Sequence, residues 1–159
     1  MEKGFGNKGI EYICCINPMR NVWAVRWDMQ DKNDIVEFME ERFDHKPTIE
    51  EIKGVIYNWY NSIIQDRIIS GFKWKDMLVW LSTENQLNYK TIYDRVVESL
   101  GKILPLTLKF GSDTEPIYHE FTTVEEFADF YHGVTEHIHS CLNNGWECKK
   151  NIDFSVYEL

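Results

Sequence analysis

The sequence predicts an α+β fold in which three amphipathic helices pack on a small antiparallel sheet, with an N-terminal β-hairpin and a short helix attached. The first observation is that apolar residues recur at helical spacing in three long segments. Each segment opens with a capping box, in which Thr48, Thr83 or Thr123 is followed three residues later by Glu or Gln. The second observation is that residues 72–81 and 104–121 place short apolar runs around polar turns, which is typical of β-hairpins.

The N-terminal region contains two predicted strands and a predicted helix. Residues 1–9 are rich in glycine and polar groups, which predicts a loose tail. Strands are predicted over Ile10–Ile16 and Val22–Trp27, because the proline and asparagines between them favour a turn. The apolar spacing over Asp34–Phe43 predicts a short helix. Its inward face comprises Ile35, Phe38, Met39 and the stem of Arg42.

The best candidate boundary in the chain lies at residues 44–47, where a charged stretch ends in a proline. We therefore expect an N-terminal part over residues 1–45, comprising the tail, hairpin and short helix, and an α+β domain over residues 46–159. The capping box at Thr48 opens the strongest predicted helix, whose central residue Trp59 we expect to face the last helix. Its apolar stripe runs over three turns and comprises Ile52, Val55, Ile56, Trp59, Tyr60, Ile63 and Ile64.

The rest of the predicted domain alternates between hairpins and helices. The hairpin over 72–81 places aromatic residues on one face of its first strand and lysines on the other. A helix follows from Thr83, and Gly101 is well placed to end it. A second hairpin over 104–121 then leads into a last helix, which opens at Thr123 and which we expect to end at Gly145.

The composition restricts the classes of function. The formal net charge is −9, which repels phosphate backbones and argues against general nucleic-acid binding. No apolar run approaches the length of a membrane span, and the first residues lack the apolar core of a signal peptide. The four cysteines do not suggest a disulfide framework, so we expect a reduced, cytoplasmic protein.

The residues with catalytic or metal-binding chemistry do not converge on one point. His137, His139 and Cys141 are the most tempting zinc ligands, but on a helix His139 points away from the other two. His45 follows an acidic run in an expected linker, where such charges are usually solvated. We therefore expect no catalytic residue, no cofactor and no metal site. The alternative is a small hydrolase or nuclease-like enzyme, which would need a pocket of convergent histidines and acidic groups.

The central hairpin is the predicted partner-binding surface. Six tryptophans exceed what a fold of this size obviously needs, and tryptophan is enriched at interface hot spots. Neighbouring amides would provide a polar rim. The predicted contact residues are Lys73, Trp74, Lys75, Trp80, Asn85, Gln86 and Asn88. The alternatives are that both tryptophans belong to the core, or that the same surface forms a homodimer.

Alternation of aromatic and basic residues over 72–75 is also typical of strands that stack nucleic-acid bases. The acidity of the whole chain instead favours a hairpin that turns its aromatic rings inward and its lysines outward. A nucleic-acid-binding module is therefore the third alternative, behind a protein-binding module and an enzyme.

Several segments resemble a family of uncharacterised phage and prophage proteins from gut anaerobes. They are VWLSTENQLNYK at Val79–Lys90, LTLKFG at Leu106–Gly111, YHEF at Tyr118–Phe121 and the pair Gly145-Trp146. The likeness covers roughly residues 47–157 in order, whereas the first 45 residues match only loosely, at Val25-Arg26-Trp27-Asp28.

Part of that family carries a domain of unknown function, and related domains occur in phage tail-fibre assembly proteins. The resemblance therefore implies a non-enzymatic assembly factor or minor structural component whose partner is a phage tail or fibre protein. It supplies no catalytic residues for this chain.

Overall fold

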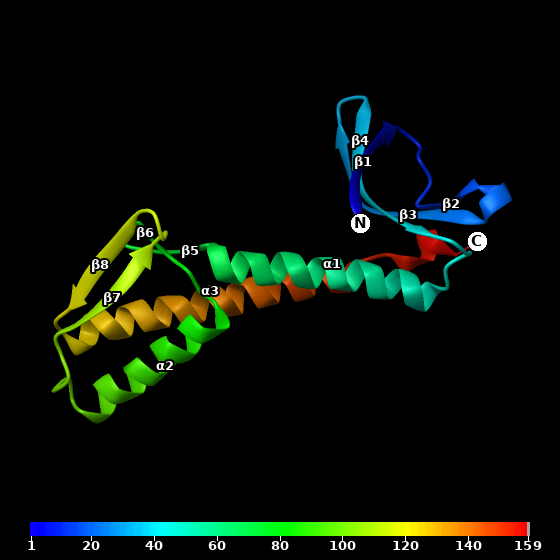
Figure 1. Cartoon of the computed structure of the whole chain (residues 1–159). Coiled ribbons are helices and arrows are strands. Elements are labelled where there is room, and N and C mark those ends of the chain that lie inside the picture. The colour runs from blue at the N-terminus through cyan, green and yellow to red at the C-terminus, as the bar shows by residue number, and fades with distance from the viewer. Residues whose placement is uncertain (159) are drawn as a thin grey trace. The chain divides into compact units, whose positions relative to one another are not determined.

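The computed structural model describes residues 1–158 and confirms the α+β fold class. The chain forms two compact units (Figure 1). The first unit comprises Met1–Tyr60 together with the segment that begins at Lys149, and the second unit comprises Asn61–Cys148. The expected division after residue 45 falls inside the first unit.

The first unit contains a four-stranded antiparallel sheet with the strand order β1-β4-β3-β2. The strands are β1 (Glu2–Asn7), β2 (Ile13–Asn17), β3 (Val22–Lys32) and β4 (Ile35–Phe43). The expected turn between β2 and β3 is a short 3₁₀ helix, Pro18–Arg20. The Asn17 side chain accepts a hydrogen bond from the Arg20 N–H, and Asn21 adopts a left-handed conformation with φ of 53°.

The expected helix over residues 34–43 is wrong, because this segment is the strand β4. The apolar positions of the segment fit a period of two as well as a period of 3.6. The strand prevails because β4 is paired with β1, far earlier in the chain, on one side and with β3, the preceding strand of a tight hairpin, on the other, so its backbone groups are satisfied by both neighbours. Both faces are partly covered, with Phe38 buried on one face and Met39 packed on the other.

The expected loose tail is also wrong, because residues 2–7 form the edge strand β1. Its glycines permit close packing. A Cβ atom at Gly4 would overlap the ring of Phe38. The glycine content of this segment therefore reflects close approach of an aromatic ring to the strand, not an absence of structure.

Arg26 is buried on the face of the sheet that carries Phe38. Its Nε donates to Glu40 at 2.9 Å, and one of its terminal nitrogens donates to the carbonyl of Glu11 at 2.9 Å. The same nitrogen lies 3.2 Å from the sulfur of Cys14, and the guanidinium stands over the Phe38 ring. A charge, a backbone acceptor and an aromatic face together compensate for removing this cation from water.

The opposite face of the sheet packs on the first half of α1 (Ile49–Ser70). Ile52 and Ile56 are fully buried there, and Trp59 meets Trp27 edge to face. The contact partner that this places beside Trp59 is a strand residue of the first unit, which the sequence did not indicate. The predicted apolar stripe of α1 is confirmed. Helical periodicity does not indicate which element packs on that stripe, and in the first unit it is the sheet.

The C-terminal residues complete the core of the first unit. They form a second 3₁₀ helix, Phe154–Tyr157, whose Asp153 cap accepts the N–H of Ser155. Tyr157 is buried, and its hydroxyl donates to the carbonyl of Arg26 at 2.8 Å. Burial raises the pKa of this phenol far above its usual value.

The N-terminus of α1 carries a pH-sensitive cluster. The Thr48 N–H donates to Glu51, and the Glu51 N–H donates to the Thr48 hydroxyl, which confirms the capping box. His45 lies between Asp44, at 2.8 Å, and Glu51, at 3.0 Å. The hydrogen bond to Asp44, and then that to Glu51, raises the pKa of His45 above 6.5.

We expect this cluster to stabilise the first unit at mildly acidic pH, where His45 is protonated while Asp44 and Glu51, whose pKa values are lowered, remain ionised. Because the folded pKa of His45 is raised, its stabilising contribution is complete below the unfolded value of 6.5 and is lost as the pH rises through the folded pKa. NMR titration should therefore give a His45 midpoint above 6.5, and His45→Gln should flatten the fall in denaturation midpoint over this range. His139→Gln, at an exposed position, is the control. A His45 midpoint at or below 6.5 would contradict the expectation.

The second unit contains two separate two-stranded sheets, not the single sheet that the sequence predicted. Its elements besides the end of α1 are β5 (Phe72–Trp74), β6 (Met77–Val79), α2 (Thr83–Glu98), β7 (Leu106–Gly111), β8 (Pro116–Phe121) and α3 (Val124–Lys150). Lys75 and Asp76 connect β5 to β6 with φ angles of 47° and 63°. This two-residue connection with positive φ at both positions matches the twist of a tight hairpin.

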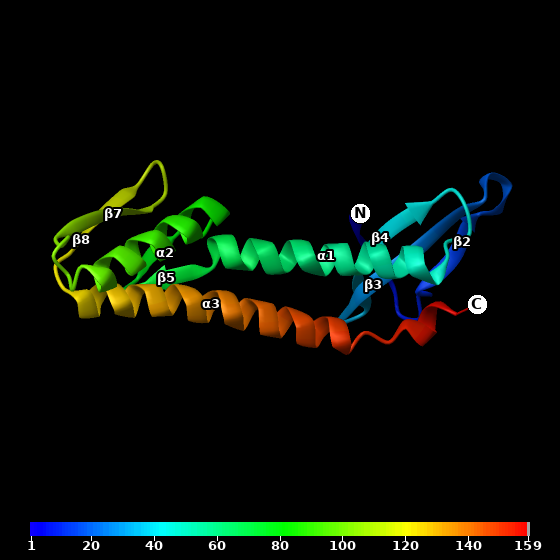
Figure 2. The same cartoon turned by 90° about the horizontal axis from the view of Figure 1, so that it is seen from below.

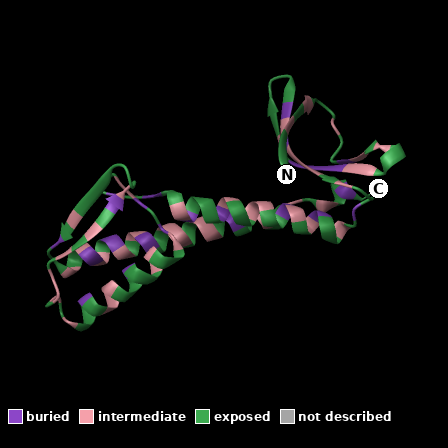
Figure 3. Cartoon of the chain, viewed as in Figure 1, coloured by how far each residue is buried: buried purple, intermediate pink, exposed green. Residues whose placement is uncertain are grey.

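An aromatic core joins the two hairpins to the helices. α2 and α3 lie side by side in both views (Figure 2), and the Tyr93 and Tyr131 rings stack between them at 4.5 Å. The buried residues of α3 are concentrated in its N-terminal half (Figure 3). The interlocking rings of this core belong to Trp74, Phe110, Phe121, Phe127 and Phe130.

Two helix ends differ from the expectation. The N-cap of α2 is Ser82, whose hydroxyl accepts the Asn85 N–H, so the helix is capped one residue earlier than the Thr83 pattern indicated. Helix α3 continues through Gly145 to Lys150. A Cβ atom at Gly145 would overlap Ile64, so this glycine permits close packing of two helices and does not end one. Within residues 1–158, no helix is long and apolar enough to cross a membrane.

Candidate functional site

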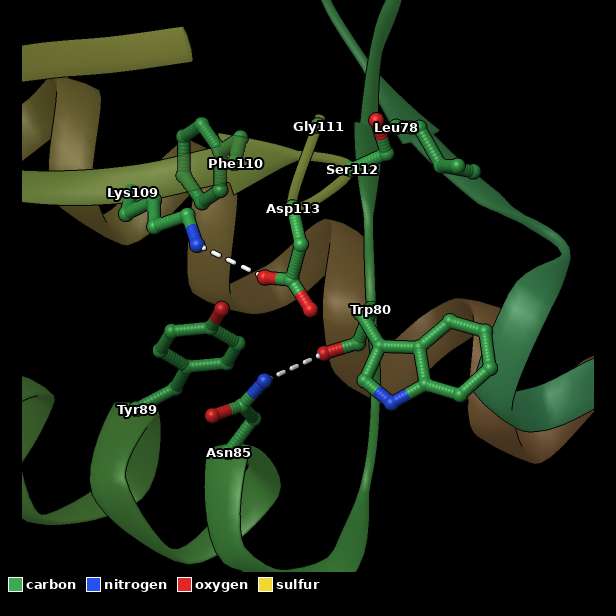
Figure 4. Close-up of a pocket in the computed structure, with 9 residues that line it drawn as sticks. All are labelled: Leu78, Trp80, Asn85, Tyr89, Lys109, Phe110, Gly111, Ser112 and Asp113. Atoms are coloured by element: carbon green, nitrogen blue, oxygen red, sulfur yellow. Dashed lines mark hydrogen bonds and ion pairs between the residues drawn. The ribbon is translucent and has the colours of Figure 1, made fainter. Parts of the chain in front are cut away.

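A groove of about 540 Å³ opens on the second unit where the end of β7, the segment after β6 and the start of α2 meet (Figure 4). Most of its lining is apolar or aromatic, with a few polar groups at the rim, as is common for recognition sites. The lining residues are Leu78, Trp80, Asn85, Tyr89, Lys109, Phe110, Gly111, Ser112 and Asp113.

The first turn of α2 fixes the segment that leads into the groove. The Asn85 side chain donates to the carbonyl of Trp80 at 2.8 Å, and the Gln86 side chain donates to the carbonyl of Leu81 at 2.7 Å. These two carbonyls would otherwise lack a partner at the junction between a strand and a helix. The amides therefore hold the backbone at Trp80 in place while leaving its indole at the surface.

Trp80 is 51% exposed. Its carbonyl is turned toward Asn85, whereas the indole lies on the other side of the segment from Tyr89 (Figure 4). A half-exposed indole on a fixed backbone loses little conformational freedom when it binds a partner, and this is why tryptophan is common at hot spots.

The polar rim is formed by the turn after β7. Lys109 donates to Asp113 at 2.8 Å, which raises the pKa of Lys109 and lowers that of Asp113. The Ser112 hydroxyl accepts the N–H of Glu115 and so stabilises the turn. Tyr89 directs its hydroxyl toward the Lys109–Asp113 pair (Figure 4), and burial raises the pKa of this phenol.

A second cleft of about 310 Å³ continues the groove along β7. The two clefts share Asn85, Tyr89 and Lys109, so they form one continuous depression between β7 and α2. The second cleft is lined by Asn85, Asn88, Tyr89, Thr91, Ile92, Leu108 and Lys109.

The structure brings three of the seven predicted contact residues to this depression, namely Trp80, Asn85 and Asn88. Gln86 is occupied with the Leu81 carbonyl and lines neither cleft. Lys73 and Lys75 are exposed on the other hairpin. Of the two predicted tryptophans, Trp80 is exposed at the surface and Trp74 is buried.

Trp74 lies in the core with 6% of its surface exposed. Its indole N–H donates to Asp129 at 2.9 Å, and its ring stacks on Phe121. Phe72 on the same strand is buried as well, so these rings are not available to stack on nucleic-acid bases. This arrangement confirms the prediction of a hairpin with aromatic rings inward and lysines outward.

Lys75 belongs to a group of polar contacts that joins the β5–β6 hairpin and β8 to α3. Its ammonium donates to Glu126 at 2.7 Å and lies over the Trp74 ring. His119 on β8 donates to the same Glu126 oxygen at 3.1 Å. The hydrogen bond from Lys75 is the main reason why the pKa of Glu126 is lowered. Lys75 therefore supports the fold, and changing it would disturb more than a binding surface.

Two of the three candidate metal ligands on α3 make structural contacts. His137 donates to the carbonyl of Arg67 at 3.0 Å, and Cys141 lies 3.6 Å from the same ring nitrogen. Burial raises the pKa of the Cys141 thiol. His139 is exposed on the helix. Across the described part of the chain, no three histidine, cysteine or acidic side chains are grouped as metal ligands would be.

Three groove residues, Tyr89, Lys109 and Asp113, were not predicted from the sequence. Helical periodicity assigns Tyr89 to the apolar stripe of its helix, and it is indeed buried. The spacing of Lys109 and Asp113 across a turn was a usable signal for an ion pair. Their position opposite α2 was not readable, because it depends on how the second hairpin packs.

Comparisons with protein-family models, with curated proteins and with solved structures give no match to this chain.

Proposed function

We propose that the chain is a non-enzymatic protein-binding module and that the groove between β7 and α2, with Trp80 at its rim, is the contact surface. The observation that carries the proposal is the half-exposed indole of Trp80 beside an apolar groove. Its backbone is fixed by Asn85 before any partner arrives. A preorganised aromatic side chain with a polar rim is the composition of a non-obligate interface.

The polar groups of the groove favour recognition over catalysis. Lys109 and Asp113 are paired with each other, and the Ser112 hydroxyl is engaged by the backbone of its own turn. General acid–base catalysis would need a histidine or carboxylate aimed at a free space beside a nucleophile. The lining of the groove contains no histidine within the described residues.

We further propose that the partner is a phage tail or fibre component and that binding takes place in the cytoplasm of the producing cell. The resemblance of Val79–Lys90 to phage and prophage proteins supports this setting. That segment includes Trp80, Asn85 and Asn88, so the part of the chain with the strongest likeness coincides with one wall of the groove.

The test compares two exposed tryptophans. Trp80 and Trp146 are 51% and 54% exposed, so replacing either by alanine should leave the fold intact. We expect Trp80→Ala to weaken binding to a purified partner by about tenfold or more, as hot-spot truncations do, and Trp146→Ala to leave it unchanged. The partner is first captured from cells in which phage genes are induced, and its affinity is then measured by calorimetry.

Lys73→Glu provides a second control, because Lys73 is exposed on the hairpin and lies outside the groove. Lys75 is unsuitable for this purpose, since its replacement would break the ion pair with Glu126. Equal affinities for the parent protein and Trp80→Ala, with both proteins folded, would exclude the groove as the contact surface.

A further inference from the structure

The groove follows the edge of β7 and not one of its faces. Successive side chains of a strand point to opposite faces. The two clefts are lined by four consecutive residues of the strand, Leu108 to Gly111, and by no residue of β8. A depression that is lined by consecutive residues runs along the backbone edge, on the side of the strand away from β8.

That edge of β7 has unused hydrogen-bonding groups. β7 is paired in register with β8 from Leu106–Phe121 to Gly111–Pro116. Among the described residues, β7 has no second strand partner, although β6 lies close to it. No other backbone or side-chain hydrogen bond reaches the main chain of residues 106–111 within the described part of the molecule. An open edge of this kind is a template for another strand.

The opposite wall of the groove is the face of α2 that carries Asn85, Asn88, Tyr89 and Ile92. An edge strand that faces a helix across a continuous groove suits one kind of ligand. An extended peptide can pair its backbone with the strand and point alternate side chains toward the core and toward solvent. Leu108 and Ile92 offer apolar contacts along the groove, while Asn88 and Thr91 offer polar ones at its outer side.

We infer that an extended segment of the partner protein binds in this groove as an additional strand on β7. The inference rests on the proposed function and specifies how the partner is held. The segment is apolar at alternate positions, and its flanks are basic. The basic flanks follow from charge complementarity, because the whole chain has a net charge of −9 and the exposed Asp113 stands at the end of the groove.

The Lys109–Asp113 pair does not prevent this binding. The Asp113 side chain is 98% exposed, and surface ion pairs of this kind are weakly held. A basic side chain of the peptide can take the place of Lys109 beside Asp113, which leaves the backbone of Lys109 free to pair. The fixed elements of the site are therefore the strand edge and the helix wall, while the ion pair is the part that adjusts.

The test uses short peptides selected from a random library against the purified full chain. The strongest binder is synthesised in two forms, each N-methylated at one of the two alternating sets of backbone positions. Strand pairing predicts that methylation of the set that faces β7 weakens binding by about tenfold or more, because it removes ladder hydrogen bonds. Methylation of the other set should leave the affinity nearly unchanged. Hydrogen exchange should show new protection of the outward amides within residues 106–111.

Each other outcome overturns the inference in a recognisable way. A peptide that depends on Trp80 but tolerates both methylation patterns, without protection of β7, would disprove strand addition and leave the protein-binding function standing. A folded partner that depends on Trp80 while no library peptide binds would disprove strand addition in the same way. A dimer in which β7 is already protected in the free protein would assign the edge to a second copy. Failure of every ligand to depend on Trp80 would remove the proposed function itself.

Discussion

Phe121→Ala is expected to destabilise the second unit by about 3–5 kcal/mol, the usual range for truncating a fully buried phenylalanine. Phe121 has no exposed surface and contacts the rings of Trp74, Phe127 and Phe130. The cavity would open at the point where both hairpins meet α3, so the surrounding rings cannot close it without moving an entire strand. A loss of this size is a large share of the stability of a typical domain.

The matched control is Tyr118→Ala on the same strand, because this side chain is 68% exposed. Urea titrations followed by tryptophan fluorescence should show a markedly lower midpoint for Phe121→Ala and a nearly unchanged one for Tyr118→Ala. Similar midpoints for the two variants would mean that the aromatic cluster contributes far less to stability than its burial indicates.

Arg26→Met is expected to destabilise the first unit by about 3 kcal/mol, at the lower end of the range for breaking a buried ion pair. The change leaves Glu40, which is largely buried, without its main partner, and it leaves the carbonyl of Glu11 without a donor. The loss stays near the lower end because Arg42 still donates to the other oxygen of Glu40.

A second substitution separates the cost of an unpaired charge from the loss of packing. In Arg26→Met with Glu40→Met, no carboxylate is left unpaired, and most of the lost stability should return. The free energies of unfolding of the parent protein, the two single variants and the double variant, measured by thermal unfolding, form a double-mutant cycle. Additive losses in the double variant would show that Arg26 contributes through packing on Phe38 and not through its charge.

The helices were predictable from the sequence, because their signals are local. Thr48 and Glu51 form the reciprocal cap that their spacing indicated, and the apolar stripe of α1 is buried where periodicity placed it. The strand β4 was not predictable in this way. Its residues fit both periods, and it pairs not only with the adjacent strand β3 but also with β1, which lies some thirty residues earlier and whose pairing no local pattern of β4 indicates.

The candidate site could be predicted in part for the same reason. Trp80 and Asn85 are close in sequence, and an aromatic residue beside polar amides was a sufficient signal for a surface. The opposite wall at Lys109 comes from the second hairpin, so only packing brings it near α2. For Trp74, alternation indicated an apolar face of the strand but could not decide between a contact surface and the core, because only packing shows that β8 and α3 cover that face.

The return of the chain to its first unit has a consequence for the order of folding. Residues 61–148 are continuous, so every side chain in the core of the second unit has been synthesised before the first unit is complete. The core under the sheet of the first unit stays incomplete until Tyr157 has been added, because this buried residue packs with the strands and with the start of α1. On the ribosome, the strands of the first unit therefore emerge before residues 61–148 but complete their core after them, and the part of their apolar face that Tyr157 covers needs protection in the interval.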